Sequence, residues 1–262
     1  MKEEKRNRRL ERREKAQQKQ RATQLRTMGL IVVGVALLVF AFIYNQTRPI
    51  TGLVTVDSTP RPQADRNSLG DPKAPIQIVE FADFQCPYCK QFYENTEPQL
   101  EEYFVKTSKV YFTYRSAGNF VSGNIGGANT ESQNAAAAAY CAADQGKFWE
   151  MNDTLFANTR DVENQGSFTS KRLIALAAIV PGLDVTTFTS CYNSGKYKDQ
   201  VQKDADDFAT AGALADPSQR GTPFFVMTYK VNGETKTEII NGAQPIDTFQ
   251  QKIEAALQIA DK

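Results

Sequence analysis

The sequence has no histidine among its 262 residues, and this absence excludes several kinds of active site. A serine or cysteine nucleophile activated by histidine cannot be built from this chain alone. Histidine is also the commonest protein ligand of transition metals, so metal chemistry loses its usual donor. The four cysteines are therefore the leading candidates for chemistry, and no cofactor is expected.

The chain also has little net charge, +1 at pH 7, but its charges are unevenly distributed. Residues 1–26 carry eleven lysines and arginines against four acidic residues, so the rest of the chain is acidic. A protein that binds nucleic acid usually presents a basic folded domain, whereas only the N-terminal arm is basic here. We therefore expect no nucleic-acid partner and attribute the arm to a membrane.

One uncharged segment, Met28 to Tyr44, is apolar enough to form a transmembrane helix. As a helix it spans about 25 Å, near the lower limit for a bilayer core. The sequence predicts an uncleaved signal anchor at residues 27–44 after a basic cytoplasmic tail at 1–26, with the rest of the chain outside the cytoplasm. A cleaved signal peptide is the alternative, but no small-residue cleavage site directly follows the segment.

Residues 45–69 show neither a helical nor a strand period, and they contain Pro49, Gly52, Pro60 and Pro62. This composition predicts a flexible linker between the anchor and a folded domain at residues 70–262. Such a linker would let the domain reach both the membrane surface and bulky substrates.

The folded part shows an order of patterns typical of a small α/β domain. Short apolar runs predict strands at 77–81, 110–114, 223–231 and 235–240, and Asn232-Gly233 predicts a hairpin turn between the last two. Helical patterns cover 87–106 and 245–260, and a long block before the hairpin is almost wholly helical. We therefore predict an α/β fold with an all-helical subdomain inserted at about residues 120–212.

A Cys-Pro-Tyr-Cys motif stands between a predicted strand and a predicted helix. A C-x-x-C pair in this position is a redox motif by spacing and by context. Pro87 suits the first position of a helix, which places Cys86 at the N-cap. Free backbone N–H groups and the helix dipole lower the pKa of a cysteine there. We expect Cys86 to be the exposed attacking sulfur and Cys89, one turn inside, to be its buried partner.

Two other readings of the motif stay open. Cys86 and Cys89 could form a plain structural disulfide, or they could be half of a zinc site. A four-cysteine zinc site would also need Cys141 and Cys191, which lie far apart in the sequence and not in a second C-x-x-C. Zinc is therefore the weaker alternative, and no metal ligand is assigned.

Five segments of the folded part carry a resemblance to a known family. They are GDPKAP at 70–75, EFADFQCPYC at 80–89, QGKFW at 145–149, GTPFF at 221–225 and NGAQP at 241–245. In this order they resemble the DsbA family of thiol-disulfide oxidoreductases, in its membrane-anchored bacterial branch. The resemblance covers about residues 70–262 and implies a thioredoxin-like fold with a helical insertion.

The resemblance implies roles for residues beyond the cysteines. Pro223 would be a cis-proline that faces the disulfide, and the backbone of Thr222 before it would pair with a bound substrate strand. Glu80 would be a buried acid under the active site that exchanges a proton with Cys89. Without the resemblance, Pro223 is an ordinary trans proline at the start of a strand, and Glu80 is a surface residue of an edge strand.

Cys141 and Cys191 both fall in the predicted helical insertion, away from the motif. In an oxidising compartment we expect two such cysteines to form a structural disulfide. Two buried free thiols are the main alternative, and a role in passing electrons to Cys86 is a weaker one.

Together these observations predict a monomeric, membrane-anchored oxidoreductase that introduces disulfides into reduced exported proteins through Cys86 and Cys89. The resemblance implies that a membrane quinone-linked thiol oxidase re-oxidises the pair. Pro87 and Tyr88 form the family's variable dipeptide, which tunes thiol stability, and family oxidases often have histidine at the Tyr88 position. A disulfide isomerase or reductase on the same scaffold therefore stays open, as does a membrane-tethered module that binds substrates without redox turnover.

Overall fold

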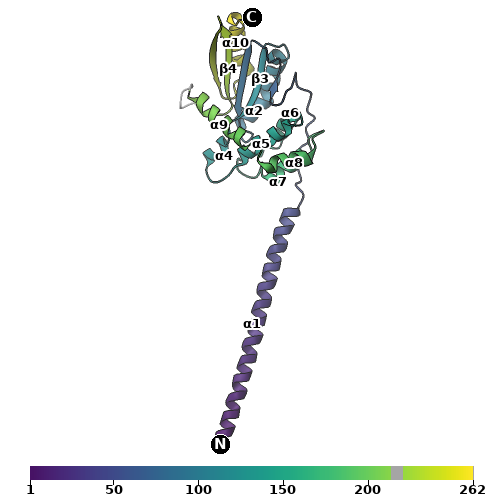
Figure 1. Cartoon of the computed structure of the whole chain (residues 1–262), viewed down its shortest axis with the longest axis vertical. Coiled ribbons are helices and arrows are strands. Elements are labelled where there is room, and N and C mark those ends of the chain that lie inside the picture. Colours follow the sequence, from purple (N-terminus) through teal and green to yellow (C-terminus); the bar gives the residue numbers. More distant parts are fainter. Residues whose placement is uncertain (214–220, 262) are drawn as a thin grey trace. The chain divides into compact units, whose positions relative to one another are not determined.

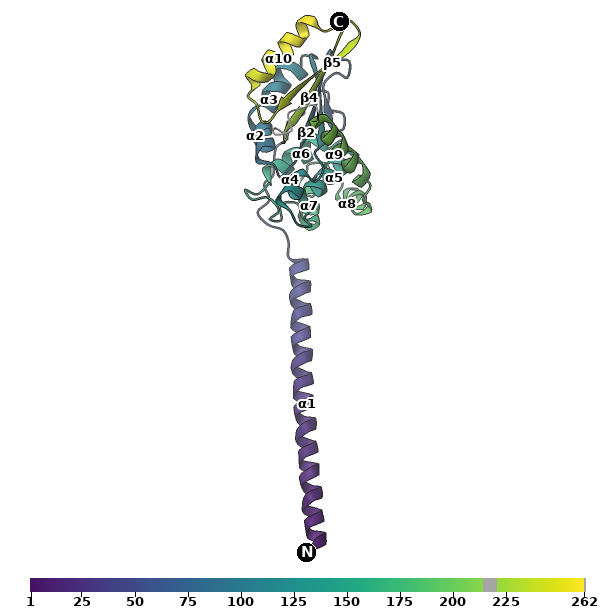
Figure 2. The same ribbon diagram turned by 90° about the vertical axis from the view of Figure 1, so that its left-hand side faces the viewer.

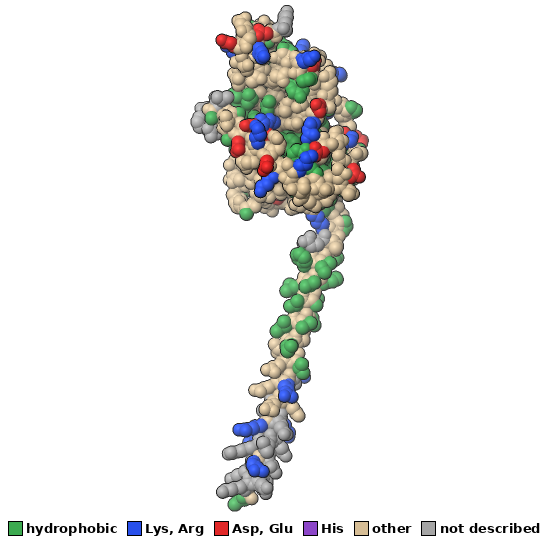
Figure 3. Space-filling model, viewed as in Figure 1, with side chains coloured by type: hydrophobic (Ala, Val, Ile, Leu, Met, Phe, Trp, Pro, Cys, Tyr) green, Lys and Arg blue, Asp and Glu red, His purple; other side chains and the backbone are tan. Residues whose placement is uncertain are grey.

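The structure, a computed structural model, describes residues 1–213 and 221–261. The chain divides into two compact units, Met1–Thr51 and Gly52–Lys262. The first unit consists largely of helix α1, Lys2–Thr47, which includes the predicted anchor and the basic segment before it. Its part Gln17–Tyr44 is long and apolar enough to cross a membrane, by length and composition. The apolar side chains of this part are exposed along the helix (Figure 3).

The second unit is built on a five-stranded sheet with the strand order β1-β3-β2-β4-β5 (Figure 1). Strands β2 and β3 are parallel, and the other neighbouring pairs are antiparallel. Positive φ angles at Asn232 and Gly233 form the tight hairpin turn that the sequence predicted. The strands are β1 Ser68–Leu69, β2 Ile76–Ala82, β3 Val110–Ser116, β4 Phe224–Val231 and β5 Glu234–Asn241.

A run of helices between β3 and residue 213 forms the helical insertion. These helices are α4 Phe120–Ile125, α5 Glu131–Ala143, α6 Phe148–Ala157, α7 Ser170–Ala177, α8 Val185–Ser194 and α9 Lys198–Gly212. They form the all-helical part of the predicted α/β fold class. After the sheet returns, the described chain ends with α10, Ile246–Ile259.

The helix predicted over residues 87–106 is broken near its middle. The structure has α2 at Pro87–Asn95, α3 at Glu97–Leu100 and a π-helical turn, η1, at Glu101–Val105. Pro98 has no backbone N–H, and its ring opposes the carbonyl four residues earlier, so a continuous helix is disfavoured there. At the break, the Thr96 hydroxyl instead donates to the carbonyl oxygen of Gln244 at 3.0 Å.

Alternation along β2 divides the core into two layers. Ile78 and Glu80 share one face of the strand, and Figure 2 shows α2, α3 and α10 together on one side of the sheet. Phe92 of α2 packs against Phe225, the β4 residue paired with Glu80, at 4.6 Å between ring centroids. Glu80 therefore lies beneath the helix that carries the cysteine motif.

Residues 52–69 are part of the folded unit, which differs from the linker predicted over 45–69. We call this segment the strap. The backbone of Val54 exchanges two hydrogen bonds with the Asn158 side chain, at 2.8 and 2.9 Å. The last two residues of the strap form β1, and Leu69 is fully buried. The contacts come from distant parts of the chain, so they leave no periodic pattern in the strap itself.

Candidate active site

The end of β2 and the start of α2 place the two cysteines at the edge of the sheet. Cys86 is the N-cap of α2, with φ −74° and ψ 121°, and Pro87 occupies the first helical turn. The carbonyl oxygen of Cys86 accepts a hydrogen bond from the Lys90 N–H at 3.1 Å, which begins the helix. The structure therefore puts Cys86 where backbone N–H groups are free to face its sulfur.

No bond joins Cys86 and Cys89; Cys89 is buried, as expected, and Cys86 is more covered than the sequence suggested. Cys89 has no exposed surface, and Cys86, which we expected to be exposed, has only 5%. The covering group is the loop before β4. The Cys86 thiol donates to the carbonyl oxygen of Thr222 at 3.2 Å, and the Thr222–Pro223 peptide bond is cis. Of the two cysteines, only Cys86 thus keeps any exposed surface.

The surroundings of the two sulfurs shift their pKa values in opposite directions. The hydrogen bond with the Cys89 thiol lowers the pKa of Cys86 to about 7, helped by the Thr222 side chain and by the N–H groups of Cys89 and Tyr88, against the effect of burial. Burial and the neighbouring Cys86 raise the pKa of Cys89 well above its usual value. Cys86 is therefore the thiolate of the pair near neutral pH.

Glu80 lies on the central strand β2 and is only 2% exposed, so it is not an edge-strand surface residue. Burial raises the pKa of Glu80 well above the usual carboxyl value, and the charges of Glu97 and Cys86 raise it further. The carboxyl group in turn contributes to the raised pKa of Cys89. Glu80 therefore keeps its proton to a higher pH than an exposed carboxyl would.

The two residues between the cysteines lie at the surface of the motif. The Tyr88 side chain is 62% exposed, so it is free to contact a partner and does not cover either sulfur. Beside Pro87 lies a cavity of about 230 Å³. Charged side chains from α2 and the segment after α6 line it: Lys90, Glu94, Arg160, Asp161 and Glu163.

Two residues just before the motif were not singled out from the sequence. The Asp83 carboxylate accepts hydrogen bonds from the N–H groups of Gln85 and Val121, at 2.9 and 3.0 Å. The Gln85 side-chain amide donates to Ser122 at 2.7 Å and to Ser132 at 2.9 Å. Both residues are buried. They fix the loop that carries Cys86 to helices α4 and α5 of the insertion.

A buried ion cluster was also missed, because its cation lies in the strap. The guanidinium of Arg61 contacts the carboxylates of Glu97, Glu101 and Asp153, the last at 2.6 Å. It also lies over the ring of Trp149, 4.8 Å from the centroid. Only 11% of the Arg61 side chain is exposed. No local signal marks such a cluster, since its members come from three separate stretches of the chain.

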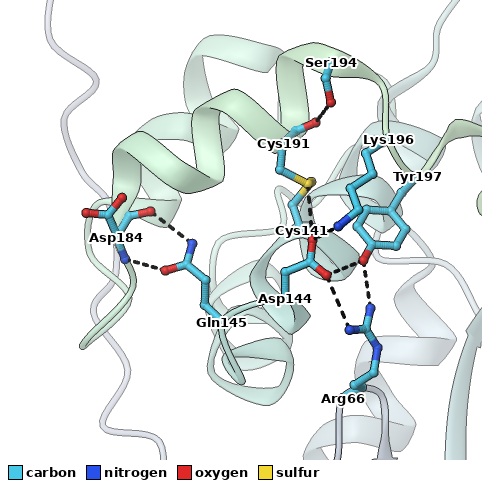
Figure 4. The surroundings of a disulfide bond; sticks show 9 residues. All are labelled: Arg66, Cys141, Asp144, Gln145, Asp184, Cys191, Ser194, Lys196 and Tyr197. Atoms are coloured by element: carbon cyan, nitrogen blue, oxygen red, sulfur yellow. Dashed lines mark hydrogen bonds and ion pairs between the residues drawn. A yellow bond between two sulfur atoms is a disulfide. The ribbon is translucent and has the colours of Figure 1, made fainter.

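Cys141 of α5 and Cys191 of α8 are joined in a disulfide, with 5.8 Å between their Cα atoms (Figure 4). Next to it, the Asp144 carboxylate accepts a hydrogen bond from the Tyr197 hydroxyl at 2.6 Å. Arg66 of the strap donates to the same hydroxyl at 2.8 Å. Cys141 and Cys191 are thus separate from the Cys86–Cys89 motif, and their disulfide cross-links α5 and α8 within the insertion.

Comparison with known families gives a match over most of the second unit. A family model described as thioredoxin matches residues 63–254. The crystal structure of oxidised BdbD from Bacillus subtilis is similar in fold, with a TM-score of 0.57 and 22% identity. That match covers 79% of this chain and 100% of the BdbD chain.

Two curated relatives extend the comparison. The probable disulfide bond formation protein D of Bacillus anthracis is 28% identical over 141 residues, which cover 54% of this chain and 62% of that protein. The Na(+)/H(+) antiporter NhaA 1 of Salinispora arenicola is 30% identical over 181 residues, 68% of this chain and 24% of the antiporter. The chain thus spans less than two thirds of the length of either relative.

Proposed function

The chain belongs to the thioredoxin family, in its DsbA-like branch, and from this premise we propose that it is an extracytoplasmic thiol-disulfide oxidoreductase. It introduces disulfides into exported proteins by exchange at Cys86 and Cys89. The observation that carries the proposal is the pair itself: an N-cap thiol with a pKa near 7 beside a fully buried thiol with a raised pKa. Because Cys89 has no exposed surface, a substrate thiolate can attack only Cys86, and the raised pKa of Cys89 favours its release as a protonated thiol.

The exchange proceeds in two balanced steps. A substrate thiolate bonds to the sulfur of Cys86 while the Cys86–Cys89 bond breaks, and the electron pair goes to Cys89, which takes a proton from Glu80. A second substrate thiolate then attacks the substrate sulfur of the mixed disulfide, and Cys86 leaves as a thiolate. The substrate has lost two electrons and the cysteine pair has gained them. The Thr222 loop lies beside Cys86, where the resemblance implies that the substrate backbone pairs.

Several observations support a site of action outside the cytoplasm. The apolar part of α1 has the length and composition of an anchor, and the basic residues before it favour a cytoplasmic N-terminus. The Cys141–Cys191 disulfide suits an oxidising compartment. Labelling of the domain with a membrane-impermeant reagent in intact cells tests this placement. Labelling only after lysis would contradict it.

The partners follow from the same reaction. The substrates are reduced exported proteins, and a quinone-linked thiol oxidase in the membrane returns Cys86 and Cys89 to the disulfide, since each turnover leaves two electrons on the pair. We propose that the chain works as a monomer. Sedimentation of the full-length protein in detergent tests this, and a stable dimer would favour an isomerase.

One observation favours a second candidate, a reductase or isomerase on the same scaffold. A pKa near 7 for Cys86 is close to that of thioredoxin, about 7, and far from that of the strong oxidant DsbA, about 3.5. The exposed Tyr88 leaves the Cys86 thiolate without a cationic neighbour in the dipeptide. A less stable thiolate makes the disulfide a weaker oxidant.

The reduction potential of Cys86–Cys89 separates these candidates. Full-length protein in detergent is equilibrated with glutathione buffers, and its thiols are trapped and counted. A value near about −120 mV supports disulfide donation, whereas one near about −270 mV would indicate a reductase. A pair that does not exchange at all would leave only a binding module, and Cys86→Ser would then retain full function.

A further inference from the structure

An ion pair between the strap and α3 lies in the helix layer on the side of the sheet that Glu80 faces. Glu80 faces the helix layer of α2 and α3, and Glu97 is the first residue of α3. Glu97 is buried and is held by the guanidinium of Arg61. The charged and titratable groups that act on Glu80 from the elements around it are Glu97 of α3, Arg61 of the strap, Cys86 and Cys89 of α2, and Tyr114 of β3.

We propose that Arg61 and Glu97 are positioning residues that act on the cysteine pair through Glu80, setting the pH range in which Glu80 holds the proton that Cys89 takes. The proposal rests on the proposed function, because it concerns the proton of the same exchange step. It gives the strap a role in the chemistry, although β1 and β2 both separate Arg61 from Cys86 along the chain.

The two residues act on Glu80 with opposite signs. The positive charge of Arg61 favours the carboxylate form of Glu80, and the negative charge of Glu97 favours the neutral form. Glu80 and Glu97 are buried and only 11% of the Arg61 side chain is exposed, so little water screens the charges between them. Arg61 therefore favours loss of the Glu80 proton, and Glu97 favours its retention.

Arg61 is itself fixed in place by groups that do not act on Glu80. Asp153 of α6 holds the guanidinium at 2.6 Å, and Trp149 lies under its plane. A cavity of about 470 Å³, lined in part by Arg61, Trp149 and Asp153, borders the cluster. Protons can thus reach the outer side of the cluster from solvent while Glu80 and Cys89 stay covered.

Oxidised full-length protein is mixed with dithiothreitol at a series of pH values, and the reduced fraction is trapped with acid and alkylated. The rate of each variant is divided by that of the wild type at the same pH, which cancels the ionisation of the dithiol. The rate falls once Glu80 has lost its proton. We expect Arg61→Gln to move this fall upward by about one pH unit and Glu97→Gln to move it downward by about one.

Two further variants separate an electrostatic role from a structural one. Arg61→Lys keeps the charge and should restore the wild-type profile even if its stability is lower. Glu150→Gln, at another residue that lines the cavity beside Arg61, removes the ion pair with Lys147 and leaves the carboxylates around Arg61 intact, so its profile should stay unchanged. Infrared absorption of the protonated Glu80 carboxyl, assigned with Glu80→Gln, follows the same shifts without depending on turnover.

Opposite shifts for Arg61→Gln and Glu97→Gln support the proposal, since a loss of folding alone moves both variants in one direction. Unchanged profiles, or shifts of the same sign, would overturn it while the wild type still reacts. A wild type that does not react with dithiothreitol would overturn the proposed function, and this inference with it.

Discussion

The Cys86 thiol lies 3.2 Å from the carbonyl oxygen of Thr222, although the two residues are 136 positions apart in the sequence. The Thr222 hydroxyl is buried and makes no hydrogen bond within the described part of the chain. Its effect is to lower the pKa of Cys86. The carbonyl oxygen of Thr222 thus accepts a hydrogen bond from the Cys86 thiol, and its hydroxyl is a donor for the thiolate.

Thr222→Val should therefore raise the pKa of Cys86 above its value near 7 by about one unit, because the thiolate loses a donor. Thiolate absorbance during a pH titration measures this change. Thr222→Ser keeps the hydroxyl and is the matched control. Equal titration midpoints for the valine and serine variants would show that the hydroxyl does not act on the sulfur.

Cys89→Ala should accumulate mixed disulfides between Cys86 and substrate proteins. Without the buried thiol, an attached substrate cannot be released by formation of the Cys86–Cys89 bond. Non-reducing electrophoresis followed by mass spectrometry detects the adducts. Cys86→Ser should give none, and adducts that persist in this variant would assign attack to another cysteine.

Removal of the second disulfide, by Cys141→Ala with Cys191→Ala, should lower the free energy of unfolding by about 4 kcal/mol in the chain-entropy model, for a separation of 50 residues. Urea unfolding of both proteins gives the difference. The rate of exchange with dithiothreitol should not change, since this pair lies in the insertion. A large loss of rate in the folded variant would mean that the second pair takes part in electron transfer.

Asp83→Asn should flatten the pH dependence of stability between about pH 4 and pH 6. Burial raises the pKa of Asp83 to about 6, whereas the unfolded chain titrates near about 3.9. The folded state therefore binds more protons in this range, and its stability from this group falls as pH rises, by about 3 kcal/mol in total. Urea midpoints of both proteins at several pH values measure the slope. Equal slopes for the wild type and Asp83→Asn would contradict the raised pKa of Asp83.

Much of the fold follows from local signals in the sequence. Short apolar runs predicted four of the strands, Asn232-Gly233 predicted the hairpin, and the structure confirms an α/β domain with an all-helical insertion. The prediction of one helix over 87–106 did not include the break at Thr96. Pro98 lies in the first turn of α3, and a proline is tolerated there, so its presence alone did not indicate where one helix ends and the next begins. The boundary at residue 70 also differs, since the compact unit begins at Gly52.

The sequence by itself determined the position of the cysteine pair, because a strand, a proline at the first helical position and the C-x-x-C spacing are all local features. Only the tertiary structure decided what surrounds the pair. Thr222 and Arg61 reach the site from far along the chain, and Glu80 becomes an acid of raised pKa only when helix α2 covers its strand. Burial and charge act through space, so no pattern of neighbouring residues records them.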